Sequence, residues 1–201
     1  LNNVCMNVYA FGGKIVFYHR VDLDAISEIS RNEKLTYMVG SPTSFAMFAA
    51  QDDKGSGRLG QYRLIVFGGG ATAEALLQPV FDLGVPMYNV YGQTETCGIV
   101  TATDAGASPK IMAETFGRPL PGAEMRIADA AGKPLPLGTS GEIQVRGPYC
   151  MTGYFGRPEA TAEAFTADGY LRTGDLGVEH PDGNFSFVGR LKEMYKSGGY
   201  N

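Results

Sequence analysis

The feature of the sequence that most constrains its fold is an alternation of strand-like and helix-like segments in the first half of the chain. Short apolar runs rich in β-branched and aromatic residues predict strands over 14–18, 36–39, 63–67 and 85–90. The segments between them predict helices over 25–29, 43–51 and 74–81. Asp22 or Asp24 can cap the first helix, and Ser41-Pro42 can begin the second. This alternation is typical of a mostly parallel sheet covered by helices, whose ligands bind beyond the carboxyl ends of the strands.

The pattern changes after Val100. Residues 101–115 predict a loop, and beyond them short strand candidates alternate with turn signals, of which Asp182-Gly183 is the strongest. The strand candidates are 124–127, 141–146, 169–173 and 184–188. Short strands at such spacing are typical of a small antiparallel sheet or barrel. We therefore predict an α/β fold in which a helix-covered, mostly parallel sheet is followed by a small antiparallel β-barrel-like module.

Length and composition set the scale of this fold. The 201 residues, 44% of them hydrophobic, suffice for one large domain or two small ones with a core. Residues 1–114 are predicted to form the α/β part and residues 115–190 the β-rich part. The basic, glycine-rich stretch 191–201 belongs to neither.

Charge and cysteine content exclude several classes of protein. The net charge of −4 gives no indication of a nucleic-acid partner or a basic membrane surface. No apolar run approaches the length of a membrane span, and we expect no signal peptide. Cys5, Cys97 and Cys150 are odd in number and lack metal-ligand spacing, which favours free thiols in a reducing compartment, the cytoplasm.

The stretch Tyr91–Glu95, directly after a predicted strand, has the parts of a nucleotide site. The aromatic ring of Tyr91 can cover a base, and Gly92 lets a ligand approach the backbone closely. The hydroxyl of Thr94 can donate to a phosphate, and the carboxylate of Glu95 can hold a magnesium ion. The alternative is a polar strand-to-loop turn without a ligand.

Gly68–Thr72 lies between a predicted strand and a predicted helix. Consecutive glycines let backbone N–H groups face a ligand, and the helix start adds a positive dipole end. The glycine spacing is not that of the dinucleotide fingerprint, and no Gly-Lys-Ser/Thr follows as in a phosphate loop. A tight turn without a ligand is the equal alternative.

Charged residues near the end of the chain supply the remaining candidates. Asp175, between Gly174 and Gly177, can accept hydrogen bonds from a ribose diol; the alternative is an Asp turn that bonds its own backbone. Arg190, Lys192 and Lys196 lie close to glycines and suit a polyphosphate or a developing anion; the alternative is a solvated basic loop. Neither His19 nor His180 has a visible nucleophile partner.

The order of these motifs resembles that of the AMP-forming adenylating enzymes, the superfamily of acyl- and aryl-CoA synthetases, peptide-synthetase adenylation domains and beetle luciferase. The resemblance covers nearly the whole chain and is carried by Gly68–Ala71, Asn89–Glu95, Phe116–Pro119, Gly141–Gly147, Gly153–Phe155, Asp168–Leu176, Gly189–Glu193 and Ser197–Asn201. The sequence of the terminal stretch, residues 192–201, is most similar to that of fatty- or medium-chain acyl-CoA synthetases.

The resemblance implies a role for each matching position. It implies that the backbone of Gly69, Gly70 and Ala71 and the side chain of Asn89 border the adenine. The Tyr91 ring would pack on the adenine, beside Gly92. The resemblance further implies that Thr94 binds the α-phosphate, Glu95 holds magnesium, Asp175 takes the ribose hydroxyls and Arg190 assists on the same side. It places Lys192 at the hinge of a small C-terminal domain, so that residues 191–201 would be the hinge and the start of that domain. It also implies that Ser197, Gly198 and Gly199 face the thiol acceptor and that Lys196 reaches the site in a second state.

The implied activity is ATP-dependent activation of a carboxylic acid, with magnesium, through an acyl-adenylate, followed by thioester formation with coenzyme A. Thr94, Glu95, Lys192 and Lys196 would be the catalytic residues. Two alternatives stay open: an adenylation domain that loads a carrier protein, and a non-catalytic adenylate-binding protein. The phosphate loop that precedes this region in the family and the C-terminal domain with its lysine are absent from the 201 residues. We therefore expect these residues alone to be inactive.

Overall fold

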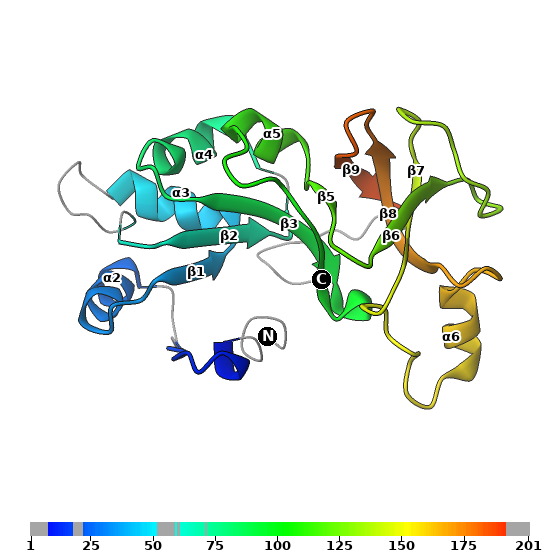
Figure 1. Ribbon diagram of the computed structural model, residues 1–201, viewed down its shortest axis with the longest axis horizontal. Helices are drawn as coiled ribbons and strands as arrows, with labels where there is room; N and C mark the ends of the chain where they lie inside the picture. The colour runs from blue at the N-terminus through cyan, green and yellow to red at the C-terminus, as the bar shows by residue number, and fades with distance from the viewer. Residues whose placement is uncertain (1–7, 18–21, 52–58, 60, 71, 192–201) are drawn as a thin grey trace. The chain divides into compact units, whose positions relative to one another are not determined.

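The computed structural model describes residues 8–17, 22–51, 59, 61–70 and 72–191 (Figure 1). The chain divides into two compact units. The first unit comprises Leu1–Val90 with Thr103–Glu114, and the second comprises Tyr91–Ala102 with Thr115–Asn201. The predicted division at residues 114 and 190 stays a prediction. None of the described helices is long and apolar enough to cross a membrane.

The first unit contains parallel strands with helices packed around them. β1 (Tyr37–Gly40) pairs in parallel with β2 (Leu64–Gly68), and β2 pairs in parallel with β3 (Met87–Gln93). The helices are α2 (Leu23–Asn32), α3 (Pro42–Gln51), α4 (Glu74–Phe81) and α5 (Pro109–Glu114). Helix α3 packs against α4, and α4 against α5 (Figure 1). The predicted helix-covered parallel sheet is therefore confirmed.

The helix starts follow from local side-chain chemistry. The Asp22 carboxylate accepts hydrogen bonds from the backbone N–H groups of Asp24 and Ala25, so Asp22 is the N-cap of α2. The Ser41 hydroxyl accepts from the backbone N–H of Ser44, and Pro42 occupies the first turn of α3. Both starts agree with the sequence prediction.

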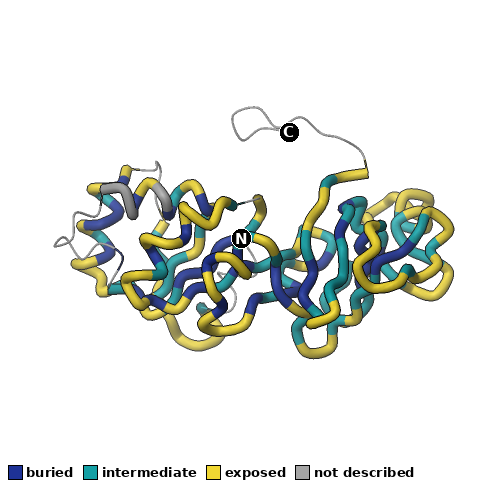
Figure 2. Tube along the Cα trace, turned by 90° about the horizontal axis from the view of Figure 1, so that it is seen from above, coloured by how far each residue is buried: buried dark blue, intermediate teal, exposed yellow. Residues whose placement is uncertain are grey.

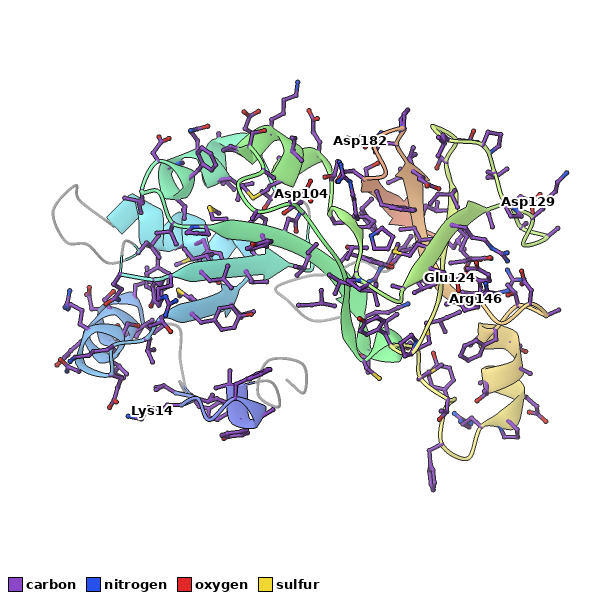
Figure 3. The ribbon with its side chains drawn as sticks, viewed as in Figure 1. Lys14, Asp104, Glu124, Asp129, Arg146 and Asp182 are labelled. Atoms are coloured by element: carbon purple, nitrogen blue, oxygen red, sulfur yellow. The ribbon has the colours of Figure 1, made fainter. Side chains whose placement is uncertain are left out.

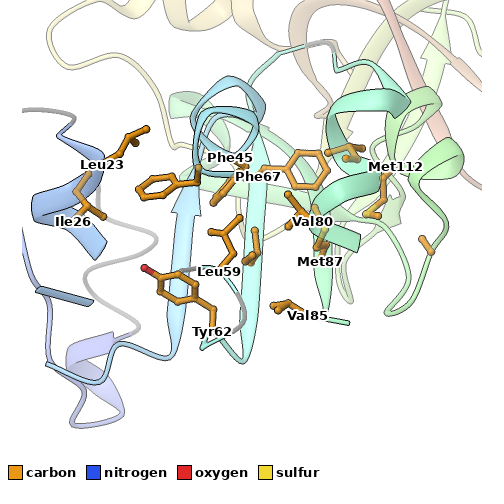
Figure 4. Close-up of a cluster of buried hydrophobic side chains, with 14 residues drawn as sticks. Leu23, Ile26, Phe45, Leu59, Tyr62, Phe67, Val80, Val85, Met87 and Met112 are labelled. Atoms are coloured by element: carbon orange, nitrogen blue, oxygen red, sulfur yellow. The ribbon is translucent and has the colours of Figure 1, made fainter. Parts of the chain in front are cut away.

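A single apolar cluster holds the first unit together (Figure 4). Phe45 of α3, Phe67 of β2, Leu77 of α4 and Met112 of α5 are at most 1% exposed. Burial of each side chain of this size contributes about 1.5–3 kcal/mol. Because these residues come from a strand and three helices, the cluster fixes the helices against the sheet.

The second unit is built from antiparallel strands. β4 (Gly98–Ala102) pairs with β5 (Arg118–Pro119), and together with β3 they complete a five-stranded sheet of order β1-β2-β3-β4-β5. A separate antiparallel sheet has the order β6-β7-β8-β9 and consists of β6 (Glu124–Ala128), β7 (Gly141–Arg146), β8 (Leu171–Glu179) and β9 (Phe185–Arg190). The predicted antiparallel module is confirmed as an open sheet, and the described strands do not close into a barrel.

The core of the second unit lies where its strands meet. Val100, Phe116, Ile127, Ile143 and Phe185 form a buried cluster. Buried chain alternates with exposed turns along the trace (Figure 2). The helix α6 (Pro158–Ala164), which the sequence analysis missed, contributes no buried residue to this core.

Two predicted segments are wrong. Residues 14–17 are not a strand, and Phe17 is 65% exposed. A segment with β-propensity forms a strand only where its side chains can pack against a neighbouring strand. Residue 18 lies outside the described residues. Residues 101–115 are not all loop, since β4 extends to Ala102 and α5 follows. The Ser108 hydroxyl accepts from the backbone N–H of Ile111, at the start of a helix too short to show a period.

The strands near the end of the chain are longer than predicted. β8 continues through Gly174 and Gly177 to Glu179, and β9 continues to Arg190. The alternative predicted here was an Asp turn at Asp175, but a Cβ at residue 177 would lie 2.6 Å from the Ser186 carbonyl oxygen of the paired strand. Close approach of two strands, and not a turn, therefore requires glycine at this position.

Candidate functional site

The polar motif after Val90 begins inside a strand. β3 includes Tyr91, Gly92 and Gln93, and a single turn of 3-10 helix, η1 (Thr94–Thr96), follows. The Gln93 and Thr96 side chains each accept from the other residue's backbone N–H, which fixes this turn. Thr94 is exposed and Glu95 half-buried. The turn therefore presents a hydroxyl and a carboxylate directly beyond the carboxyl end of the strand.

Gly92 is required by the fold of the second unit. A Cβ at this position would lie 1.7 Å from the Gly98 carbonyl oxygen of β4, closer than any side chain tolerates. The sequence analysis explained this glycine by close approach of a ligand. The structure supplies a sufficient reason within the sheet, and the assignment of Gly92 to nucleotide binding stays a prediction.

Asp175 lies at the centre of the site in the second unit. It is directly opposite Arg190 in the antiparallel pair of β8 and β9. The Arg190 Nε lies 3.0 Å from the Asp175 Oδ1. The Tyr91 hydroxyl donates to the Asp175 Oδ2 at 2.8 Å. A contact between residues 91 and 175, which are 84 positions apart, thus joins two of the predicted site residues.

Burial makes this carboxylate unusual. Asp175 is 4% exposed, and an ionised carboxylate at such a depth is stable only where charge and hydrogen bonds compensate the lost water. The Thr173 hydroxyl accepts from the backbone N–H of Asp175, so the side chain does not form the predicted alternative, a turn with its own backbone. Arg190 likewise lies in a strand and not in a solvated loop.

The Tyr91 ring is supported by an aromatic stack. Its centroid lies 4.6 Å from that of Phe116, and the Phe116 centroid lies 6.4 Å from that of Phe185. Burial, and then the neighbouring Asp175 charge, raises the pKa of the Tyr91 hydroxyl far above its ordinary value. The phenol is therefore a neutral donor to Asp175. Sequence reasoning assigned no function to Phe116, although it begins one of the family motifs.

Glu95 is held at two points by the loop that precedes α6. The Tyr154 hydroxyl donates to the Glu95 Oε1 at 2.9 Å, and the Met151 backbone N–H donates to the Glu95 carbonyl oxygen at 2.7 Å. Tyr154 belongs to the family motif Gly153–Phe155, for which the sequence predicts no role. The contact could not be predicted from the sequence, because 59 positions separate Tyr154 from Glu95 and no motif contains both residues.

The environment of Glu95 fits one kind of metal ion. No group of three or more His, Cys, Asp or Glu side chains in the described ranges could hold a metal. Magnesium in nucleotide sites is bound by one or two carboxylates together with substrate phosphates and water. A single half-buried carboxylate on an exposed turn fits that mode, whereas a site for zinc or calcium needs more protein ligands.

The first unit carries the glycine candidates. Gly69 has a φ of +79°, and neither Gly69 nor Gly70 would bring a Cβ within 4 Å of another atom, so open space surrounds this turn. The neighbouring Gly68 differs, because its Cβ would lie 2.3 Å from the Val90 carbonyl oxygen. The Asn89 amide is buried and donates to the Met112 carbonyl oxygen at 2.8 Å, a contact that ties β3 to α5.

The remaining predicted site residues lie outside the described residues. They are Ala71, Lys192, Lys196, Ser197, Gly198 and Gly199. Their assigned roles stay predictions.

A mostly parallel, helix-covered sheet is the fold of many nucleotide-binding proteins, whose ligands bind beyond the carboxyl ends of the strands. The family model of the AMP-binding enzyme matches residues 1–155, and the chain belongs to this family. The class predicted from the motifs is thereby confirmed.

Curated relatives and solved structures agree with this membership. The chain is 35% identical over 202 residues to a feruloyl-CoA synthase of Amycolatopsis sp. This match covers 100% of this chain and 40% of the relative. It is 33% identical over 190 residues to a long-chain-fatty-acid–CoA ligase of Thermus thermophilus, with 90% and 35% covered. The chain thus spans well under half the length of these relatives.

A solved structure matches the fold of nearly the whole chain. The O-succinylbenzoate coenzyme A synthetase of Bacillus subtilis, in complex with ATP and magnesium ion, has a TM-score of 0.81 and 27% identity. The match covers 98% of this chain and 40% of that chain. The fold described here is therefore that of an AMP-binding enzyme.

Proposed function

We propose that this protein activates a carboxylic acid with ATP and transfers the acyl group to coenzyme A. The observation that carries the proposal is the contact of Tyr91 and Arg190 with the buried carboxylate of Asp175. It joins a stacking ring, a diol acceptor and a cation in one unit. These are the groups that a nucleoside monophosphate needs.

Among the described residues, each oxygen of Asp175 has one hydrogen-bonding or ion-pair partner and retains further acceptor capacity. We assign these lone pairs to the ribose hydroxyls. The ring of Tyr91 would stack on the adenine, with Phe116 fixing its plane from behind. The open backbone at Gly69 and Gly70, with Ala71 and Asn89, would border the base.

Thr94 and Glu95 would act at the phosphates. The exposed Thr94 hydroxyl would donate to the α-phosphate, and the Glu95 carboxylate would hold magnesium. Magnesium, when bound, neutralises phosphate charge and makes pyrophosphate a better leaving group. The contribution of the chain is to place and neutralise the reacting groups.

The proposed reaction has two steps. A carboxylate oxygen attacks the α-phosphorus of ATP, pyrophosphate leaves, and an acyl-adenylate forms. The sulfur of coenzyme A then attacks the acyl carbon, AMP leaves, and a thioester forms. We assign the hinge between the two steps to Lys192, contacts with the thiol acceptor to Ser197, Gly198 and Gly199, and a second-state contact to Lys196.

Nucleotide binding tests the site directly. Asp175→Asn retains the shape of the side chain but removes its charge, so we expect it to weaken AMP binding about tenfold or more, the loss typical of a charged hydrogen bond. The matched control is Asp168→Asn, because Asp168 also pairs with an arginine of the same unit. Isothermal titration of AMP measures both. Equal affinities of Asp175→Asn and wild type would refute the assignment.

We propose a fatty acid as the substrate, on the resemblance of the last stretch of the chain and on the long-chain relative. Thermal-shift titration with non-hydrolysable acyl-adenylate mimics checks this, since a ligand of the native state raises its stability. We expect stabilisation to increase with acyl-chain length. A larger stabilisation by an aromatic mimic than by any fatty-acyl mimic would contradict a fatty acid as the substrate. In a separate assay of thioester formation, failure of coenzyme A as acceptor would favour the carrier-protein alternative.

We also propose that the 201 residues alone do not turn over, because the phosphate loop and the C-terminal lysine of the family lie outside them. Detectable acyl-AMP formation by these residues would contradict this. We also propose that the protein works in the cytoplasm, because Cys5, Cys97 and Cys150 are odd in number and lack metal-ligand spacing.

A further inference from the structure

We propose that Tyr154 is a positioning residue that fixes the Glu95 carboxylate for magnesium. This inference rests on the proposed role of Glu95 as the magnesium ligand. The carrying observation is the hydrogen bond of 2.9 Å from the Tyr154 hydroxyl to the Glu95 Oε1.

Two bonds from one short segment restrain Glu95. Met151 donates its backbone N–H to the Glu95 carbonyl oxygen at 2.7 Å, and Tyr154 holds the side chain of the same residue. The first bond fixes the turn η1, and the second fixes the rotamer. A carboxylate on a one-turn helix would otherwise rotate freely in water, and its ordering would oppose metal binding.

The segment that carries Tyr154 is itself braced by α6. The Thr161 hydroxyl accepts from the backbone N–H of Tyr154 at 2.9 Å and donates to the Arg157 carbonyl oxygen at 2.8 Å. Gly153 has a φ of +152°, and a Cβ there would lie 2.7 Å from the Thr161 methyl carbon. Because α6 has no buried residue, its visible contribution is this brace and not core packing.

A phenol suits the task at neutral pH. Its hydroxyl supplies a single O–H donor, which is directed at the Glu95 Oε1. It occupies one acceptor position of Oε1, and no side chain in the described ranges is recorded as a donor to Oε2. The second oxygen therefore keeps its lone pairs for magnesium or its water ligands. Such outer partners of metal ligands typically change metal affinity about 10–100-fold when they are removed.

The test is a magnesium titration of ATP binding in the full-length protein, with AMP binding in the absence of metal as the second readout. We expect Tyr154→Phe to raise the magnesium concentration for half-maximal ATP binding about tenfold, with AMP affinity unchanged. Thr161→Val should raise it by a smaller factor. Tyr170→Phe is the matched control, because it removes a phenol-to-carboxylate bond of the same unit, that of Tyr170 with Glu124.

The outcomes separate the inference from the proposed function. If Glu95→Gln raises the magnesium requirement but Tyr154→Phe behaves as wild type, the inference is overturned and the role of Glu95 stands. If Glu95→Gln has no effect, the metal role of Glu95 fails and the inference fails with it. An equal effect of Tyr154→Phe and Tyr170→Phe, or a parallel loss of AMP affinity, would indicate a structural role and overturn the inference.

Discussion

Two clusters of the second unit use the same residue types in opposite ways. In the site cluster, Tyr91, Asp175 and Arg190 meet around a carboxylate that is 4% exposed. The surface cluster contains a tyrosine, two arginines and two acids: Glu124, Arg126, Arg146, Asp168 and Tyr170. Figure 3 shows Glu124 and Arg146 of the surface cluster side by side.

The surface cluster is closed on itself. The guanidinium of Arg126 lies 3.9 Å from the centre of the Tyr170 ring, and that of Arg146 lies 4.5 Å from it. Arg126 forms two hydrogen bonds to Asp168, and Arg146 pairs with Glu124. Each of the two arginines thus pairs with an acidic side chain, and both guanidinium groups lie over the Tyr170 ring. This arrangement can stabilise the sheet, and the guanidinium groups already occupy positions over the ring that a base would need.

The site cluster differs through what covers its tyrosine. The recorded ring partner of Tyr91 is Phe116, a neutral side chain, and the single cation Arg190 pairs with Asp175. The carboxylate accepts from a phenol and a guanidinium that both come from other strands. Burial and an apolar stack therefore distinguish the site cluster from the surface cluster, although both combine a tyrosine with arginine and acidic side chains.

The largest expected difference between the clusters is in stability. Asp175→Ala leaves Arg190 without its partner and Tyr91 without its acceptor. We expect a loss of about 1–3 kcal/mol in the free energy of unfolding, because the part-buried Tyr91 hydroxyl loses its acceptor, whereas the Arg190 side chain is 40% exposed and can be solvated. Asp168→Ala should cost much less, since its side chain is 55% exposed. Urea unfolding of both variants measures the difference.

A loss in Asp168→Ala as large as that in Asp175→Ala would contradict the comparison. Salt sharpens it. Screening weakens exposed pairs more than buried ones, so molar sodium chloride should reduce the effect of Asp168→Ala and leave most of that of Asp175→Ala.

Much of the fold could be predicted because local signals and tertiary packing agree. The helix over residues 74–81 has the predicted bounds, and the caps at Asp22 and Ser41 follow from side-chain chemistry. The exceptions are segments whose state depends on a distant neighbour. Residues 14–17 have strand propensity without a described partner strand, and α6 has no buried residue.

The site could be predicted as a set of residues but not as a set of contacts. Motifs singled out Tyr91, Glu95, Asp175 and Arg190, yet no spacing indicates that a phenol reaches across 84 positions to Asp175. The pairing of β8 with β9 creates the Asp175–Arg190 contact, because it sets the two residues opposite each other. Gly92 shows that a motif residue can also have a structural cause. The sequence suggested that a ligand approaches this glycine, but the neighbouring strand already requires glycine there.

The smallest expected difference concerns alkaline pH. Burial beside Asp175 raises the pKa of Tyr91 well above its ordinary value of 10.0. The folded state therefore keeps a proton that the unfolded chain releases near pH 10. Stability that is fully present below that pH is lost as the pH rises further. Tyr91→Phe removes this proton linkage, so we expect its unfolding free energy to fall less steeply than that of wild type from about pH 9 to about pH 11.

Tyr170 is the control for this measurement. Burial and its hydrogen bond to Glu124 raise its pKa too, but the charges of Arg146 and Arg126 oppose the shift because they favour the phenolate. Tyr170→Phe should therefore change the alkaline slope less than Tyr91→Phe. Urea unfolding across that pH range gives both slopes, and equal slopes for the two variants would mean that Tyr91 is no more strongly desolvated than a tyrosine of the surface cluster.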